Sequence, residues 1–192
     1  MADQFFAFIS RMRYISRWGL MRNTFHENIQ EHSHMVAVLA HGLAVIRRDV
    51  FHQPANPDAA AVAALYHDAP EIFTGDLPTP VKYYNPEIRD AYKEVEAVSA
   101  GKLLAMLPPE LRPAYDSLLR EDYDPETHRL VKAADKLSAY IKCVEELKAG
   151  NLEFRQAADQ TLAALKAMDL PELDYFMDHF MPGFSLTLDE LQ

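Results

Sequence analysis

The sequence predicts an all-α fold, a single compact bundle of helices. Helix-start signals recur along the chain, because a capping Asn or Asp stands directly before a proline at positions 56, 85 and 124. Strand signals are missing, since there is no run of alternating β-branched residues and no Asn-Gly hairpin turn. The length of 192 residues suits about one domain, and no repeat or linker divides it. We therefore expect residues 1–192 to form one helical domain.

The first two helices are predicted from side-chain spacing and from a capping box. Residues 4–17 place Phe5 and further apolar side chains on one face at helical intervals. Asn28 and Glu31 then have the spacing of a capping box, in which the two side chains satisfy free backbone amides at a helix start. We expect the helix that begins there to run to about residue 48.

Later in the chain, the Asn/Asp-Pro pairs and a few helix breakers predict five more helices. They are expected at residues 57–68, 86–106, 125–149, 152–168 and 172–180. Gly150 is a natural stop for the third of these, and Pro171 separates the last two. Between the first two lies an irregular stretch, residues 69–85, which is rich in proline. Structured loops in such places often carry substrate contacts.

Composition favours a protein of a reducing compartment. No apolar run approaches the ~20 residues of a membrane span, and the N-terminus lacks the basic start and cleavage site of a signal peptide. Cys143 is the one cysteine of the sequence, which excludes a disulfide framework. We therefore expect a cytoplasmic protein with no membrane partner.

The charge distribution argues against polymeric nucleic acid as a partner. The formal net charge is −10, whereas nucleic acid binding rewards basic surfaces. Residues 1–22 nevertheless carry four arginines against one acidic residue, a local balance of +3. A small electropositive region in an acidic molecule suits a small anion, although a solvated basic helix face explains the same pattern.

A set of inward-facing polar side chains predicts a metal site: His32, His67, Asp68 and Asp135. His32 lies in the first turn of its helix, with apolar residues following on the same face. His67 and Asp68 end an apolar helix, and Asp135 lies on the inward stripe of another. Any one of these residues alone is more often a hydrogen-bonded core residue or an ion-pair partner. Together they are hard to satisfy without a cation, since an unpaired buried carboxylate is unstable.

The donor types indicate which metals fit. Two imidazoles with carboxylates and no thiolate favour borderline transition metals over Mg²⁺ or Ca²⁺. We expect one divalent transition metal, Co²⁺ or Mn²⁺ first, with Zn²⁺, Ni²⁺, Fe²⁺ or Cu²⁺ as alternatives. His128 stands too near a helix start to join the cluster. The remaining histidines, expected at the surface or in packing, are His26, His34, His41, His52 and His179.

With its H…HD…D ligand order and the motifs around it, the chain resembles the YfbR-type HD-domain 5′-deoxynucleotidases. The resemblance covers nearly the whole chain and rests on three stretches: SRWGLMRNTFHENIQEHS, ALYHDAPEIFTGDLPTPVKYYN and KAADKLSAYIKCVEELKAGN. It implies an all-helical HD domain that forms homodimers. It also implies release of phosphate from deoxyribonucleoside 5′-monophosphates with the help of a divalent transition metal. We expect broad tolerance of the base.

The resemblance further implies roles for individual residues. The metal ligands would be His32, His67, Asp68 and Asp135, and the substrate contacts Arg17, Trp18, His32, Asp68, Asp76, Leu77, Pro78, Thr79 and Asp135. Arg17 matches a residue that orients the substrate phosphate, Trp18 one beside the sugar, and Glu71 a catalytic acid. Arg17, Asp68 and Glu71 are thus the expected catalytic residues. An indole packed against C2′ would leave no room for a 2′-hydroxyl, which would exclude ribonucleotides.

Each of these residues also has a purely structural explanation. A surface salt bridge accounts for Arg17, and a core anchor at a helix end accounts for Trp18. Glu71 is explained by the favourable interaction of an acid with the dipole at a helix start. The loop at residues 76–79 is explained as a simple rigid turn.

Two other functions stay open at this point. One is another HD phosphohydrolase, acting on cyclic nucleotides or guanosine tetraphosphate, although the short chain favours a monophosphate pocket. The other is a non-catalytic helical module that senses nucleotides or binds a partner, in which Arg17 and Glu71 would be replaceable. The C-terminal sequence DYFMDHFMPGFSL is apolar enough for a dimer interface or for packing on its own core.

Overall fold

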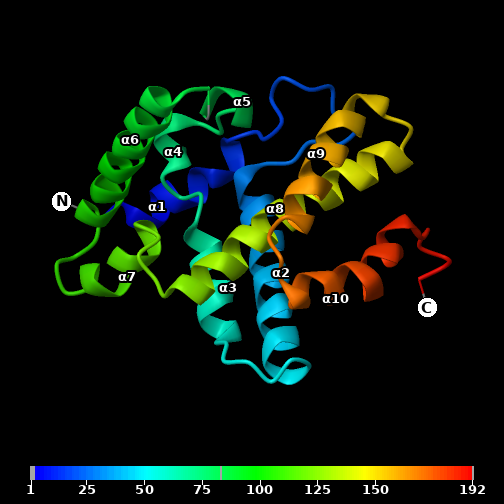
Figure 1. Cartoon of the computed structure of the whole chain (residues 1–192). Helices are drawn as coiled ribbons and strands as arrows, with labels where there is room; N and C mark the ends of the chain where they lie inside the picture. The colour runs from blue at the N-terminus through cyan, green and yellow to red at the C-terminus, as the bar shows by residue number, and fades with distance from the viewer. Residues whose placement is uncertain (1–2, 83, 192) are drawn as a thin grey trace.

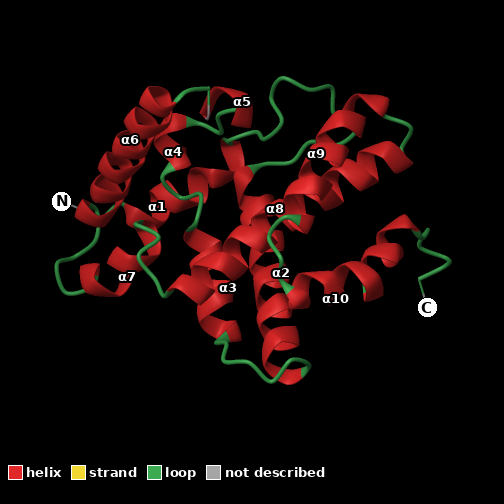
Figure 2. Cartoon of the chain, viewed as in Figure 1, coloured by secondary structure: helices red, strands yellow, loops and turns green. Residues whose placement is uncertain are grey.

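Helices make up the regular structure of the described chain, residues 3–82 and 84–191 of this computed structural model (Figure 2). In chain order the α-helices and 3-10 helices (η) are α1 (Phe5–Ile9), η1 (Ser10–Tyr14), α2 (Ile29–Asp49), α3 (Pro57–Tyr66), α4 (Glu71–Thr74), α5 (Thr79–Lys82), α6 (Pro86–Ala105), α7 (Arg112–Leu119), α8 (Pro125–Lys148), η2 (Leu152–Phe154), α9 (Arg155–Lys166), α10 (Pro171–His179) and η3 (Met181–Ser185). Within those ranges the β pairing is an isolated antiparallel bridge between Ser16 and Asn28. The all-α prediction is confirmed. None of the described helices combines the length and apolarity that a membrane crossing requires.

The predicted helix-start signals form as side-chain caps. Asn28 accepts a hydrogen bond from the backbone N–H of Glu31 at 3.0 Å, and the Glu31 side chain accepts one from the Asn28 N–H at 3.1 Å. The capping box of α2 is therefore present. Asn56, Asn85 and Asp124 accept hydrogen bonds from the first turns of α3, α6 and α8. Each such cap stabilises its helix by ~1 kcal/mol and fixes where it begins.

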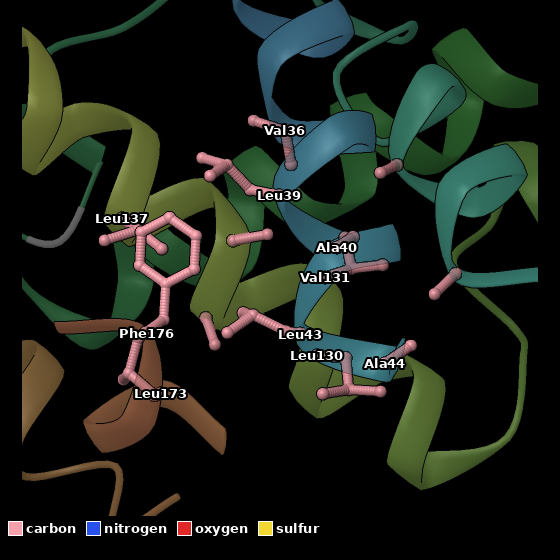
Figure 3. Packing of buried hydrophobic residues seen from close by; sticks show 14 of the residues in the cluster. Val36, Leu39, Ala40, Leu43, Ala44, Leu130, Val131, Leu137, Leu173 and Phe176 are labelled. Atoms are coloured by element: carbon pink, nitrogen blue, oxygen red, sulfur yellow. The ribbon is translucent and has the colours of Figure 1, made fainter. Parts of the chain in front are cut away.

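α2, α3, α8 and α10 share the main hydrophobic core (Figures 1 and 3). Leu43 from α2 packs near Leu130 and Leu137 from α8, and all three are fully buried. α10 adds Leu173 and Phe176 to the same cluster (Figure 3). Burial of one leucine side chain contributes about 1.5–3 kcal/mol. This core therefore sets the relative positions of the three helices that carry the predicted metal ligands.

A second hydrophobic cluster covers the chain just beyond the end of α3. α1, α6 and α7, which lie together in Figure 1, contribute Phe5, Leu103 and Leu119, and they surround the buried Ala69. Ala69 directly follows the His67-Asp68 pair. The cluster therefore anchors the segment that carries this pair.

The first helix is shorter than expected, and the prediction of helix over residues 15–17 was wrong. From Ile15 to Arg17 the chain pairs with the residues just before α2 and the first residue of α2. The amide of Ile29 donates to the carbonyl of Ile15 at 3.0 Å, and the amide of Arg17 donates to the carbonyl of Glu27 at 2.9 Å. These bonds join residues ten or more positions apart along the chain, so local apolar spacing could not reveal them.

Three short helices also differ from the predictions. α4 and α5 lie inside the stretch that was expected to be irregular, and four residues each are too few to show helical periodicity. α7 was not predicted, because Leu111 stands at its N-cap and offers no capping side chain. Gly150, with a φ of 84°, follows the end of α8 as predicted.

Candidate functional site

The first turn of α2 places His32 at the centre of the candidate site. The capping box holds this turn, and the His32 side chain is fully buried. Its Nδ1 shares a 3.2 Å hydrogen bond with Oγ of Ser138 on α8. Its Nε2 lies 3.1 Å from Oδ1 of Asp135 on the same helix. His32 therefore links α2 to α8 through both ring nitrogens.

The end of α3 brings His67 and Asp68 beside His32. Nδ1 of His67 donates to the backbone carbonyl of Ala64 at 2.7 Å, because a carbonyl oxygen can only accept. When the ring is neutral, it presents a lone pair at Nε2. This buried Nε2 makes no hydrogen bond among the described residues, yet it lies 3.2 Å from Oδ2 of Asp68. Two acceptor atoms at that distance require a positive charge close to both of them.

The four predicted ligands converge on one point. Ligand atoms of His32, His67 and Asp135 all lie within 4.8 Å of one another. Oδ2 of Asp68 lies 3.6 Å from Nε2 of His32 and 3.2 Å from Nε2 of His67. Ligand atoms about 2.0–2.2 Å from one ion are about 3–4 Å apart. The spacing and the donor types therefore fit one divalent transition metal.

The carboxylates give this point a preference for positive charge. Burial lowers the pKa of His67, but the charges of Asp68 and Asp135 outweigh it and raise that pKa to about 9. For the two carboxyls, burial raises the pKa, and the neighbouring imidazoles lower it to well below the usual range. A divalent cation would satisfy the same carboxylates in place of a proton.

Arg17 lies beside the ligand cluster. Its Nη1 is 3.4 Å from Oδ2 of Asp68 and 3.9 Å from Oδ1 of Asp76. Its Nε donates to Oε2 of Glu27 at 3.2 Å. Burial lowers the pKa of Arg17, but the surrounding carboxylates, Asp68 first, raise it overall, so the guanidinium stays charged. A fixed guanidinium next to a metal site is suited to binding phosphate oxygens.

Trp18 follows Arg17 in an unusual backbone conformation. Its φ is 56°, in the left-handed region that residues other than glycine rarely adopt. The indole Nε1 donates to Oε2 of Glu27 at 3.1 Å, and the ring packs on Phe154 with centroids 5.3 Å apart. Such strain persists where the surroundings hold the residue in place. The Trp18 carbonyl also accepts hydrogen bonds from the Met21 amide at 2.9 Å and from the Asn23 side chain at 3.3 Å, so both the backbone and the side chain of Trp18 are held.

Glu71 begins α4, one turn after His67, and its side chain is buried. Its Oε1 accepts a hydrogen bond from Nζ of Lys82 at 2.8 Å, whereas its buried Oε2 has no partner among the described residues. Burial and the charge of Asp68 outweigh the effect of Lys82 and raise the pKa of Glu71 to about 8. Glu71 can therefore hold a proton near neutral pH and release it at Oε2.

The loop after α4 carries the remaining predicted contacts. Asp76 faces Arg17 at 3.9 Å, as described above. Leu77 and Pro78 are half-buried in the same loop, and the side chain of Thr79 lies outside the described part of the chain. The histidines expected outside the site are exposed at the surface: His26, His34, His41, His52 and His179.

Three residues of the site were missed by sequence reasoning. Glu27 contacts both Arg17 and Trp18, Lys82 contacts Glu71, and Ser138 contacts His32. All three lie inside the sequence stretches that carried the family resemblance. No spacing rule marks a single glutamate, lysine or serine as the partner of a distant side chain, so only the fold identifies them.

Comparison with known proteins gives matches over nearly the whole chain. The sequence matches the 5′-deoxynucleotidase YfbR-like family over residues 4–184. It is 51% identical over 190 residues to a Yersinia pestis (strain Pestoides F) protein named 5′-deoxynucleotidase, and the match covers 98% of this chain and 96% of that protein.

Two solved structures share the fold. An HD-domain phosphohydrolase from Listeria innocua, 25% identical, has a TM-score of 0.82 and covers 94% of this chain and 88% of its own. The HD phosphohydrolase DatZ of cyanophage S-2L, bound to dA and one catalytic Zn²⁺ ion, is also 25% identical. Its TM-score is 0.69, over 94% of this chain and 96% of its own. The family resemblance drawn from the motifs is confirmed, and this chain belongs to the 5′-deoxynucleotidase YfbR-like family.

Proposed function

We propose that this protein is a metal-dependent 5′-deoxynucleotidase, which hydrolyses 2′-deoxyribonucleoside 5′-monophosphates to a deoxynucleoside and phosphate. The observation that carries the proposal is the convergence of two imidazoles and two carboxylates next to Arg17, whose Nη1 lies 3.4 Å from Asp68. Membership of the family and the 51% identical relative named 5′-deoxynucleotidase support the substrate class. The neighbour bound to dA and Zn²⁺ supports a nucleoside site beside a metal.

His32, His67, Asp68 and Asp135 would hold the metal, for which Co²⁺ and Mn²⁺ are the first candidates. The mixed nitrogen and oxygen donors suit such borderline ions. When bound, a divalent metal lowers the pKa of water near it and neutralises charge on the phosphoryl group.

The protein side chains have separate tasks in the hydrolysis. A bond forms between a water oxygen and phosphorus, and the bond from phosphorus to O5′ breaks. Arg17 binds the phosphate oxygens and orients them, since phosphoryl transfer depends mainly on positioning and charge neutralisation. Asp68, which contacts Arg17 and His67, orients the water through a hydrogen bond, and the proton that the water loses passes to a phosphate oxygen. Glu71 delivers a proton to O5′ from Oε2, the oxygen that Lys82 leaves free.

The sugar is selected by shape. Trp18 is held next to Arg17, so its indole would lie beside C2′ when Arg17 binds the phosphate. A 2′-hydroxyl would then collide with the ring, and such steric exclusion discriminates without any new attraction. The loop from Asp76 to Thr79 contacts the nucleoside, and we expect broad tolerance of the base.

A phosphate-release assay tests this function. Chelated protein receives single metals and a panel of deoxy- and ribonucleoside 5′- and 3′-monophosphates together with cyclic nucleotides. We expect release from 5′-deoxynucleotides alone, restored by Co²⁺ or Mn²⁺ and lost in His67→Ala. His34→Ala, which replaces an exposed histidine of α2, should behave like the wild type. Preference for a cyclic substrate, or no release with any metal, would refute the proposal.

We also propose that one HD domain spans residues 1–192 and that two copies form a homodimer. The C-terminal segment contributes Phe176 and Met181 to the core, but it leaves Phe180 49% exposed. Phe180 borders an apolar hollow of about 1050 Å³ between α2, α8 and the C-terminal segment. These surfaces support contact with a second copy. Light scattering coupled to size-exclusion chromatography measures the mass, and a monomer at micromolar concentration would contradict the homodimer.

A further inference from the structure

We propose that Glu27 is a positioning residue, which sets the placement of Arg17 and Trp18 relative to each other. The inference rests on the proposed function, because that function assigns these two side chains to the phosphate and the sugar. Oε2 of Glu27 accepts a hydrogen bond from Nε of Arg17 at 3.2 Å and another from Nε1 of Trp18 at 3.1 Å. Two consecutive side chains therefore share a single acceptor oxygen.

The backbone ties the same two segments together. The amide of Arg17 donates to the carbonyl of Glu27 at 2.9 Å. Glu27 directly precedes Asn28, the N-cap of α2, and His32 follows in the first turn of that helix. Glu27 thus connects the Arg17-Trp18 pair to the helix start that carries a metal ligand. A displacement of Glu27 would change the distance between the phosphate-binding group and the ligand cluster.

The side chain of Glu27 restrains the orientation of the Arg17 and Trp18 side chains, which the backbone hydrogen bond alone does not do. A carboxylate on Nε fixes the plane of the guanidinium, and Nη1 then points to Asp68 and Asp76. Charge-assisted hydrogen bonds of this kind are about twice as strong as neutral ones. The side chains of Arg17 and Glu27 are 12% and 14% exposed, so water competes weakly for this contact. The second hydrogen bond holds an indole whose backbone is strained at a φ of 56°.

Because the two donors share one oxygen, phosphate orientation and sugar discrimination are coupled through Glu27. Loss of the acceptor should reduce kcat/KM for dAMP by up to about 100-fold, the usual effect of misplacing a reacting group by an ångström. The rate on AMP should fall less, since a mobile indole no longer excludes the 2′-hydroxyl. The ratio of kcat/KM for dAMP to kcat/KM for AMP (the dAMP to AMP ratio) should therefore decrease.

The fluorescence of Trp18 tests the positioning independently of catalysis, because it is the one tryptophan of the sequence. In Glu27→Ala we expect lower anisotropy and stronger quenching by iodide than in the wild type. Glu27→Gln keeps an amide oxygen that accepts both hydrogen bonds, so it should restore the wild-type signal. If circular dichroism finds Glu27→Ala unfolded, Glu27→Met, which keeps the volume without the acceptor, replaces it. Wild-type anisotropy and quenching in the folded variant would overturn the proposal.

Kinetics with dAMP and AMP form the second arm of the test. Glu31→Ala is the matched control, because it removes the capping box of α2 but has no contact with Arg17 or Trp18. It should lower stability and leave the dAMP to AMP ratio unchanged, whereas Glu27→Ala should lower the ratio and Glu27→Gln should restore it. Equal loss on both substrates in Glu27→Ala would overturn the role of Glu27 in discrimination. A wild type inactive on every deoxynucleotide would refute the proposed function alone, and the Trp18 signal would still decide whether Glu27 positions the indole.

Discussion

At the scale of single residues, the two histidines of the cluster are oriented in different ways. Nδ1 of His32 shares a hydrogen bond with Ser138, a side chain on another helix. Nδ1 of His67 donates to the backbone carbonyl of Ala64 in its own helix. In both cases one ring nitrogen is engaged, and the other faces the point where the carboxylates converge. Such partners normally tune metal affinity, because they fix the ring and its tautomer.

Replacement of Ser138 by alanine should therefore weaken metal binding by about 10–100-fold, the range found for partners of ligating histidines. The ring of His32 would lose its hydrogen bond at Nδ1 and turn more freely. Metal titration of the chelated protein by calorimetry measures the change. Ser33→Ala is the matched control, because Ser33 is buried on α2 and its Oγ has no hydrogen-bond partner among the described residues. Equal affinities in the two variants would contradict the prediction.

A second residue-scale feature is the buried carboxylate of Glu146 on α8. It accepts hydrogen bonds from Lys142, from the backbone and hydroxyl of Thr24, and from Asn151. Burial raises the pKa of Glu146, but these donors, Lys142 first, outweigh it and lower the pKa from 4.5 to about 2. The interaction joins the segment before α2 to α8.

The lowered pKa of Glu146 predicts a contribution to acid stability. Because the folded value lies below the unfolded one, the contribution is complete above pH 4.5 and is lost as the pH falls toward 2. Urea unfolding at pH 7, 4.5 and 3 measures it. Glu146→Gln should be less stable than the wild type at pH 7, and the difference should shrink at pH 3. A pH-independent difference would show that the carboxylate charge is not responsible.

At the scale of elements, the predicted metal ligands lie at different distances from the starts of their helices. His32 lies in the first turn of α2, directly after the capping box. Asp135 lies about three turns into α8, far from the cap at Asp124. A frayed first turn would therefore move one ligand and leave the other in place.

Two cap variants test this difference. Asn28→Ala and Asp124→Ala should each lower the free energy of unfolding by ~1 kcal/mol, the usual value of an N-cap. Asn28→Ala should in addition weaken metal binding, because His32 lies in the turn that frays. Denaturant unfolding and metal titration of both variants give the comparison. If Asp124→Ala weakens metal binding as strongly, the cause is general destabilisation and not the position of His32.

At the scale of the whole molecule, the predicted ligand cluster joins two consecutive helices, α2 and α3, to the distant helix α8. α2 supplies His32, the end of α3 supplies His67 and Asp68, and α8 supplies Asp135. An ion held there would act as a cross-link at the centre of the fold. Since unfolding separates these helices, a metal that binds the folded state must stabilise it.

Metal at 100 times its dissociation constant should stabilise the folded protein by ~2.7 kcal/mol. For a chain of this size, that corresponds to a rise in Tm of roughly 5–10 °C. Differential scanning calorimetry with added Co²⁺ and with chelator measures the shift. His67→Ala should lose most of it, whereas His34→Ala should keep it. An identical Tm with metal and with chelator would contradict a site built from three helices.

The parts of this molecule that were predictable from sequence are those set by local signals. Capping residues such as Asn85 and Asp124 stand next to the turns they stabilise, so helix starts could be read directly. The backbone pairing of residues 15–17 and the role of Glu27 arise from contacts between distant segments, which local spacing does not encode. The roles of the site residues, the extent of the single domain, the metal identity, the homodimer and the cytoplasmic location stay predictions.

The backbone carbonyl of Ala64, which holds Nδ1 of His67, has a consequence for how this site evolves. Every amino acid carries that carbonyl, so no substitution at position 64 deletes the acceptor, although a larger side chain would disturb the packing. Ser138, in contrast, loses its hydroxyl through a single replacement. Lineages that drift at other positions should therefore keep the tautomer of His67 while the partner of His32 varies. The orientation of His67 is therefore less sensitive to mutation than that of His32, because a main-chain carbonyl maintains it.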